Sequence, residues 1–124
     1  QNKVHLEIIT DADDATLCQH YQTADLFALT SVPHKHSVEG FGLVYLEAGA
    51  YGLACIAYDI GGVSDAVIHN KTGHLLTVGD IHSLTESIRF FYENPDERKR
   101  LGQQNKEHAL SRTWSDVVKE TLQL

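Results

Sequence analysis

The chain has 124 residues, 42% of them hydrophobic and 22% charged, which indicates one globular domain and argues against a disordered segment. Seventeen acidic and ten basic side chains give a formal charge of −7. This charge argues against non-specific nucleic-acid binding, because such binding needs Lys and Arg to neutralise phosphates. No run approaches the roughly 18 consecutive apolar residues of a membrane-spanning helix.

The cysteines and the missing methionine bear on the origin of the chain. Cys18 and Cys55 lack the spacing of a metal site or a disulfide framework, so we interpret them as free thiols of a cytoplasmic protein. No signal peptide is visible, and the sequon at residues 70–72 is interpreted as an ordinary turn. Because the sequence contains no Met, we expect a chain that is processed or cut from a longer one.

Strand and helix patterns alternate from the N-terminus onward. Residues 4–9 alternate apolar and polar side chains and predict a strand, and Asp11 to Asp14 supply the capping groups of a following helix over 15–22. The compact apolar run at 25–29 predicts a strand buried on both faces. The remaining elements, in order, are a helix over 43–51, a buried strand over 54–58, a helical turn over 64–68, a strand over 74–78, and helices over 81–92, 96–110 and 114–122.

This alternation indicates an α/β domain with a short, mainly parallel sheet of about four strands. Ligands of such sheets bind at the carboxyl ends of the strands, where loops lead into helix N-termini. Two loops therefore merit attention. One follows Leu29, and the other follows Tyr58 and contains the tight turn Gly61-Gly62.

The first loop carries groups suited to an anion. Gly40 and Gly42 stand immediately before a helix, so the backbone can approach a ligand closely. The amides of Gly42, Leu43 and Val44 have no intrahelical partner and lie at the positive end of the helix dipole. We expect an anion site here, with a phosphate as the ligand.

Two glutamates flank this segment. Glu39 precedes the helix, and Glu47 lies about one turn inside it, beside Leu43, Leu46 and Ala50 at helical spacing. This spacing places the Glu47 carboxylate near the apolar side of the helix, where it needs a hydrogen-bonding partner. A sugar or ribose diol fits that need, and so does a basic neighbour or a loop that Glu47 caps; the spacing does not choose between them.

The sequence around the two glutamates resembles the E-x7-E signature of the retaining glycosyltransferases of family 4, which have the GT-B fold. The segment reads Glu39-Gly-Phe-Gly-Leu-Val-Tyr-Leu-Glu47-Ala-Gly-Ala-Tyr-Gly52. The resemblance covers nearly the whole chain in order: it starts upstream at residues 24–31, continues downstream through 61–67 and 71–76, and ends at 100–102 and 113–115. It implies a Rossmann-like three-layer α/β/α architecture. The chain then corresponds, over residues 1–124, to a single partial domain, the C-terminal donor-binding half of a GT-B enzyme.

The resemblance also implies roles for individual residues. Glu47 matches the glutamate that binds the ribose hydroxyls of the nucleotide, and Glu39 matches the catalytic glutamate beside the transferred sugar. The segment that contacts the donor diphosphate and sugar corresponds to Gly40, Phe41, Gly42, Leu43 and Val44. The implied reaction transfers a sugar from a nucleotide diphosphate sugar to a hydroxyl with retention, and oriented amides stabilise the departing diphosphate. Such enzymes generally need no metal, and the acceptor stays open among a glycan, a lipid-linked molecule and a small molecule.

The sequence also departs from the family pattern. The first strands of the donor domain, their Arg and Lys, and the N-terminal acceptor domain have no counterpart here, so we expect the chain alone to be inactive. The cut leaves the strand at 25–29 with an open edge, so we expect the strand at 4–9 to pack beside it or two chains to pair there as a homodimer. The full-length enzyme is expected in the cytoplasm, with a peripheral position at the inner face of the membrane as an option.

Two points stay open at this stage. His34 and His36 form a His-x-His pair in the first loop, but without a third ligand we interpret this loop as a polar one rather than as a metal site. The alternative function is that of a non-catalytic domain of the same fold that binds a phosphate, a nucleotide or a protein partner, with Glu47 in a structural role.

Overall fold

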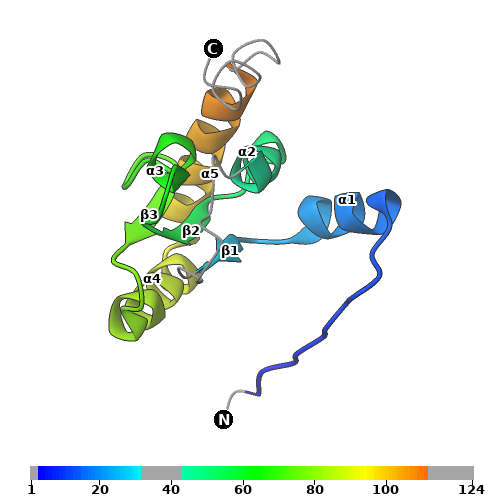
Figure 1. Ribbon diagram of the computed structural model, residues 1–124, viewed down its shortest axis with the longest axis horizontal. Helices are drawn as coiled ribbons and strands as arrows, with labels where there is room; N and C mark the ends of the chain where they lie inside the picture. The colour runs from blue at the N-terminus through cyan, green and yellow to red at the C-terminus, as the bar shows by residue number, and fades with distance from the viewer. Residues whose placement is uncertain (1–2, 32–42, 112–124) are drawn as a thin grey trace.

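The computed structural model describes residues 3–31 and 43–111. Three parallel strands form one sheet in the order β1-β2-β3, and helices pack around it (Figure 1). The strands are β1 (Phe27–Leu29), β2 (Cys55–Tyr58) and β3 (Gly73–Leu76). The helices are α1 (Asp14–Thr23), α2 (Leu43–Ala50), α3 (Val63–Ala66), α4 (Ile81–Glu93) and α5 (Pro95–Leu110).

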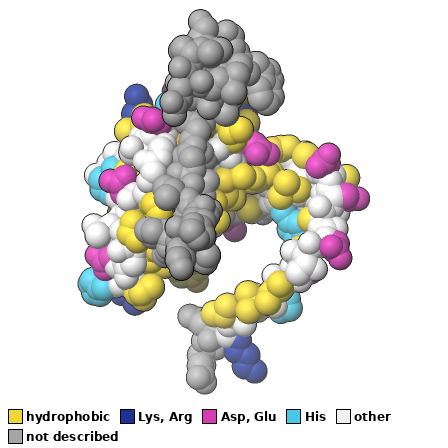
Figure 2. Space-filling view, viewed as in Figure 1, with side chains coloured by type: hydrophobic (Ala, Val, Ile, Leu, Met, Phe, Trp, Pro, Cys, Tyr) yellow, Lys and Arg dark blue, Asp and Glu magenta, His cyan; other side chains and the backbone are white. Residues whose placement is uncertain are grey.

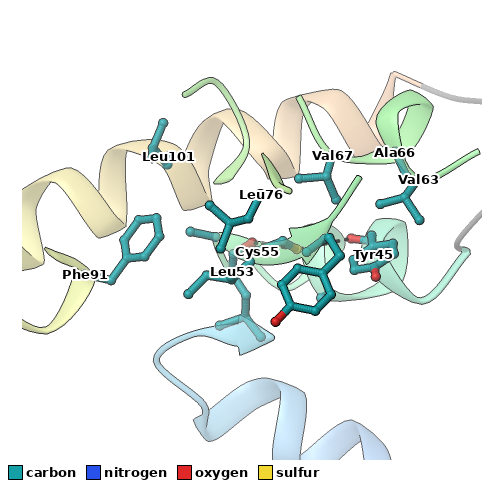
Figure 3. Close-up of a cluster of buried hydrophobic side chains, with 14 of the residues drawn as sticks. Tyr45, Leu53, Cys55, Val63, Ala66, Val67, Leu76, Phe91 and Leu101 are labelled. Carbon is teal, nitrogen blue, oxygen red and sulfur yellow. Dashed lines mark hydrogen bonds between the residues drawn. The ribbon is translucent and has the colours of Figure 1, made fainter. Parts of the chain in front are cut away.

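The central strand β2 lies in the middle of the hydrophobic core. All four of its residues are buried, and it pairs with β1 from Phe27↔Cys55 onward and with β3 from Cys55↔Gly73 onward. Figure 3 shows Cys55 in the middle of the cluster, between Phe91 of α4, Leu101 of α5 and Tyr45 of α2. A strand with neighbours on both edges and helices around it is what a continuous apolar run predicts.

Strands β2 and β3 approach closely because β3 starts with a glycine. A Cβ added to Gly73 would lie 1.9 Å from the carbonyl oxygen of Cys55 and 2.7 Å from its carbonyl carbon. Backbone atoms cannot move aside as a flexible side chain can, so Gly73 is required for this register.

The two helices after the sheet begin where local chemistry predicts. Asp80 caps α4 by accepting a hydrogen bond from the amide of Ser83 at 3.0 Å. Asn94 ends α4, and Pro95 occupies the first turn of α5, where its missing amide costs nothing. The earlier helix α1 is capped in the same way by Asp13, which accepts from the amide of Thr16 at 2.8 Å. These boundaries confirm the sequence prediction to within one or two residues.

The strand predicted at residues 4–9 is wrong. This segment is extended but pairs with no strand of the described residues, and the exposed fractions of Val4, Leu6 and Ile8 are 93%, 77% and 78%. Figure 2 shows apolar side chains on an arm that extends away from the body of the molecule. The alternation gives the segment one apolar face, but no neighbouring strand or helix covers it, so the sheet has three strands among the described residues rather than four.

The strand β1 is also less buried than the sequence predicts. It begins at Phe27 instead of at residue 25; Phe27 and Leu29 are only half-buried, and Ala28 is exposed. As the first strand of the order β1-β2-β3 it has one open edge.

The helix predicted at 114–122 lies outside the described residues. Within the described ranges, no helix has the length and apolar character needed to cross a membrane.

Candidate functional site

The helix α2 begins at the carboxyl edge of the sheet, where ligands of parallel α/β domains bind. Its third residue, Tyr45, donates a hydrogen bond from its hydroxyl to the carbonyl of Leu29, the last residue of β1, at 3.0 Å. Tyr45 is fully buried, and its ring meets the Phe27 ring edge-on, with 5.8 Å between the centroids. The first turn of α2 is therefore held directly against the end of β1.

The first turn of α2 has the electrostatic character that an anion site needs. Among the described residues, no acidic side chain lies in that turn to offset the positive end of the helix dipole. Leu43 is exposed, and Val44 is half-buried. Of the residues predicted to contact the donor, Leu43 and Val44 therefore lie in the first turn of α2.

Glu47 lies on the exposed side of α2, and the prediction that it is near the apolar side of the helix is wrong. The buried residues of α2 are Tyr45, Ala48 and Gly49, whereas Glu47 and its neighbour Ala50 are exposed. Leu43, which suggested an apolar surrounding, is itself 41% exposed. The carboxylate makes no hydrogen bond or ion pair with the described residues, so neither a basic neighbour nor a capped loop engages it in this part of the chain.

The side of α2 that carries Glu47 faces α1. The rings of Tyr21 and Tyr51 stack with 5.2 Å between centroids, which joins the C-terminal half of α1 to the residue after α2. Burial raises the pKa of Tyr21, and the negative charge of Glu47 raises it further. A hydrogen bond with Cys18 raises the pKa of Tyr51, and Glu47 adds to this as well. The Glu47 carboxylate therefore lies within electrostatic reach of two phenols.

The second loop leaves the same edge of the sheet. After β2, the amide of Asp59 donates to the carbonyl of Leu76 at 2.7 Å, and Gly61 takes a left-handed φ of 56° that turns the chain into α3. The tight turn predicted at Gly61-Gly62 is confirmed. The helix predicted over 64–68 is shorter and starts one residue earlier.

Several predicted site residues lie outside the described residues. These are Glu39, Gly40, Phe41 and Gly42 of the glycine loop, and the pair His34 and His36. Within the described ranges, no three His, Cys, Asp or Glu side chains come together in a group that could hold a metal ion.

A shallow pocket of about 260 Å³ lies elsewhere in the molecule. It is lined by Lys71, which precedes β3, and by side chains from the last turns of α5 together with Ser111: Gln104, Glu107 and His108. Lys71 stands before the amino end of β3, whereas α2 begins beyond the carboxyl end of β1. The pocket is therefore separate from the α2 terminus.

Two residues of the α2 surroundings were not singled out from the sequence. Tyr45 holds α2 to β1 through its hydroxyl. Asn105 lies in a polar helix but is 1% exposed, and it bonds to the turn after α2. A signal for Asn105 was present, because Leu101, Gly102 and Asn105 occupy one face of α5 at helical spacing, and all three are buried.

This fold is shared with known proteins. The family model described as Glycosyl transferases group 1 matches residues 1–108. The D-inositol 3-phosphate glycosyltransferase of Corynebacterium urealyticum is 32% identical over 104 residues, which cover 84% of this chain and 23% of that protein. The chain belongs to the glycosyl transferases group 1 family.

Solved structures agree with the family. A sucrose-phosphate synthase from Thermosynechococcus elongatus matches 93% of this chain and 28% of its own, with a TM-score of 0.77 and 27% identity. The Anabaena protein HepE, solved in complex with UDP-glucose, matches 87% of this chain and 28% of its own, with a TM-score of 0.71 and 29% identity. These neighbours establish the fold as that of GT-B glycosyltransferases. The chain spans about a quarter of the length of each of these three proteins.

Proposed function

We propose that this chain is the donor-binding part of a retaining glycosyltransferase, which transfers a sugar from a nucleotide diphosphate sugar to a hydroxyl group. The position of α2 carries the proposal. Its N-terminus lies at the carboxyl edge of the sheet, and no acidic side chain of its first turn offsets the positive end of the helix dipole. The exposed carboxylate of Glu47 follows one turn later. The family membership supports it, as do the structures of HepE with UDP-glucose and with UDP.

In this proposal, each part of the α2 region acts on one part of the donor. The amides of the first turn receive the diphosphate, with Gly40, Phe41, Gly42, Leu43 and Val44 as the contacting segment. Glu47 accepts hydrogen bonds from the ribose hydroxyls, and Glu39 is the catalytic glutamate beside the transferred sugar. As the bond to the sugar breaks, negative charge grows on the diphosphate, and preorganised amides stabilise it without having to reorient.

Calorimetry with UDP, GDP and ADP tests this assignment. The variant Glu47→Ala should weaken binding of the preferred nucleotide by roughly tenfold or more, because hydrogen bonds to a charged group contribute about 1.5–3 kcal/mol. Glu86→Ala is the matched control: Glu86 is an exposed helical glutamate on α4 whose ion pair is with Arg89, and its removal should leave nucleotide affinity unchanged. Equal, negligible binding by the parent and Glu47→Ala would instead favour the non-catalytic interaction domain.

The proposal includes no metal ion in donor binding. The diphosphate charge is met by backbone amides and the helix dipole, as the family resemblance implies, so EDTA should leave the nucleotide affinity of this chain unchanged. A nucleotide affinity that EDTA abolishes and magnesium restores would overturn this part of the proposal.

The chain alone is proposed to lack transferase activity, since it spans about a quarter of its relatives and the acceptor has to be bound as well. Incubation with UDP-glucose, GDP-mannose or ADP-glucose should release no nucleotide diphosphate above the rate without protein. Turnover that Glu39→Ala abolishes would contradict this.

The two thiols, Cys18 and Cys55, are both free, and on this basis we propose a location in the cytoplasm.

The open edge of β1 is a further part of the proposal. Ala28 is exposed, and in a parallel ladder its amide and carbonyl point away from β2, because those of Phe27 and Leu29 point toward it. An unpaired edge is a template for another strand, so we propose that two chains associate through β1. Light scattering should give a dimer that Ala28→Pro converts to a monomer, and a monomeric parent would contradict the proposal.

A further inference from the structure

The end of α2 packs against a buried side-chain amide of α5. Asn105 of α5 is 1% exposed, and its Nδ2 donates to the carbonyl of Leu53 at 2.8 Å and to Sγ of Cys55 at 3.3 Å. Leu53 lies in the turn between α2 and β2, and Cys55 opens β2. One side chain thus connects α5 to both the end of α2 and the central strand.

The fit between Asn105 and α2 is close. A Cβ added to Gly49, in the last turn of α2, would lie 2.8 Å from both Cγ and Oδ1 of Asn105. Carbon atoms do not approach this closely without a shift of one partner. The side chain of Asn105 therefore occupies the space that any larger residue at position 49 would need. The last turn of α2 packs directly against this side chain.

The start of α2 is held by a second polar contact. Tyr45 is fully buried and donates to the carbonyl of Leu29 at 3.0 Å, so the first turn of α2 is fixed to the end of β1. Cys55 lies between the two contacts: its Sγ is 3.9 Å from the Tyr45 carbonyl. Burial raises the pKa of Cys55 to about 12, so its thiol remains neutral and free to donate.

Packing alone does not call for an amide at position 105. Oδ1 of Asn105 is buried and has no hydrogen-bond partner among the described residues, and an unpaired buried oxygen is destabilising. The hydrogen bonds from Nδ2 instead fix the orientation of α5 relative to the turn after α2 and to β2. A hydrogen bond fixes the relative orientation of two elements more tightly than an apolar contact does. The same holds for the hydroxyl of Tyr45.

We propose that Tyr45 and Asn105 are positioning residues that hold α2 at its two ends and thereby place the Glu47 carboxylate for the nucleotide. Glu47 lies two residues after Tyr45 and two before Gly49, midway between the two contacts. Successive helical residues turn by about 100°, so a side chain two residues from each contact points away from the buried side. The role assigned to Glu47 rests on the proposed function, whereas the fixing of α2 does not.

The test separates polar positioning from packing with three variants. Tyr45→Phe removes only a hydroxyl. Asn105→Ala removes the amide and leaves a space, and Asn105→Ala combined with Gly49→Ala refills part of that space without restoring any hydrogen bond. Phe91→Leu, a core change on α4 that touches neither contact, is the control for a general loss of stability.

Two readouts are compared for each variant of the 124-residue chain. Hydrogen exchange of the α2 amides, relative to those of α4, should rise about five- to tenfold in Tyr45→Phe and in the double variant, but not in Phe91→Leu. The Kd for UDP should rise about three- to tenfold in the same two variants and less than twofold in the control.

The outcomes are distinguishable. If the double variant returns α2 exchange and UDP affinity to parent values, packing and not the polar contacts positions α2, and the proposal is overturned. Unchanged α2 exchange in Tyr45→Phe and Asn105→Ala overturns it as well. If the parent chain does not bind UDP, the proposed function and the role of Glu47 are overturned, while the exchange data still decide whether Tyr45 and Asn105 fix α2.

Discussion

Two apolar segments of this chain differ in how much of their surface is buried. β2 (Cys55–Tyr58) is buried at every position, whereas residues 4–9 carry the same kind of side chain into solvent. The difference lies in their neighbours, because β2 has a strand on each edge and helices α2, α4 and α5 around it, while the described residues give residues 4–9 no partner. An apolar pattern tells which face a strand would bury, but not whether anything is present to cover it.

The two segments should also differ in their contribution to the free energy of unfolding. Burying a Val, Leu or Ile side chain contributes about 1.5–3 kcal/mol, and an exposed one contributes almost nothing. Residues of β2 should therefore dominate the free energy of unfolding, and those of the N-terminal arm should be nearly silent. Substitutions in the two segments test this difference.

The largest effect is expected from one chemical change made in both segments. Ile56→Ala should lower the free energy of unfolding by about 3–4 kcal/mol, since Ile56 is fully buried and leaves a cavity. Ile8→Ala should change it by less than about 0.5 kcal/mol, since Ile8 is 78% exposed. Urea unfolding measures both. Similar losses in the two variants would show that residues 4–9 are packed in solution.

The second effect concerns the pairing of β2 with β3. Gly73→Ala places a Cβ against the backbone of Cys55 and should cost about 2–3 kcal/mol. Gly79→Ala is the control: its Cβ meets open space, and only its left-handed φ of 78° opposes the change, at about 1 kcal/mol. A Gly73→Ala variant no less stable than Gly79→Ala would contradict the close approach of the two strands.

The smallest effect is a pH dependence at the edge strand β3. Burial lowers the pKa of His74, and nearby His69 lowers it further, while Glu97 opposes the shift. Nδ1 of His74 lies 2.6 Å from the Ser87 hydroxyl, and the ring lies against Phe91 with 4.5 Å between centroids. Burial and His69 thus favour the neutral ring, and only Glu97 favours the charged one.

The direction of the pH dependence follows from proton uptake. Below the ordinary pKa of 6.5, the unfolded chain binds a proton that folded His74 resists, so the free energy of unfolding falls as the pH drops through that range. His74→Gln should flatten the profile between pH 7.5 and 5.5, and His82→Gln, at an exposed position of α4, should not. Identical profiles for His74→Gln and the parent would contradict the assignment.

The parts of the structure that sequence predicts well depend on neighbours in the chain. The cap at Asp80, the stop before Pro95 and the turn at Gly61 are fixed by groups within a few residues. The buried strand 54–58 was also predicted, since a run with no polar residue has few other places to lie.

The parts that failed depend on contacts between distant segments. The apolar pattern of residues 4–9 does not show whether a neighbouring strand is present to pair with them. The side of α2 on which Glu47 lies depends on two distant contacts: Tyr45 with β1, and Gly49 with Asn105. The sequence placed Glu47 on α2 correctly but assigned it to the wrong side. The contact of Asn105 with Leu53, 52 positions away, is beyond any local pattern.

Hydrogen exchange of the chain with and without saturating UDP tests directly whether α2 binds the nucleotide. We predict that UDP slows exchange in α2 and the loop before it, and leaves residues 4–9 and α4 unchanged. Glu47→Ala should abolish this protection at the same UDP concentration. No change in α2, or protection confined to residues 4–9 or to the pocket beside Lys71, would contradict it.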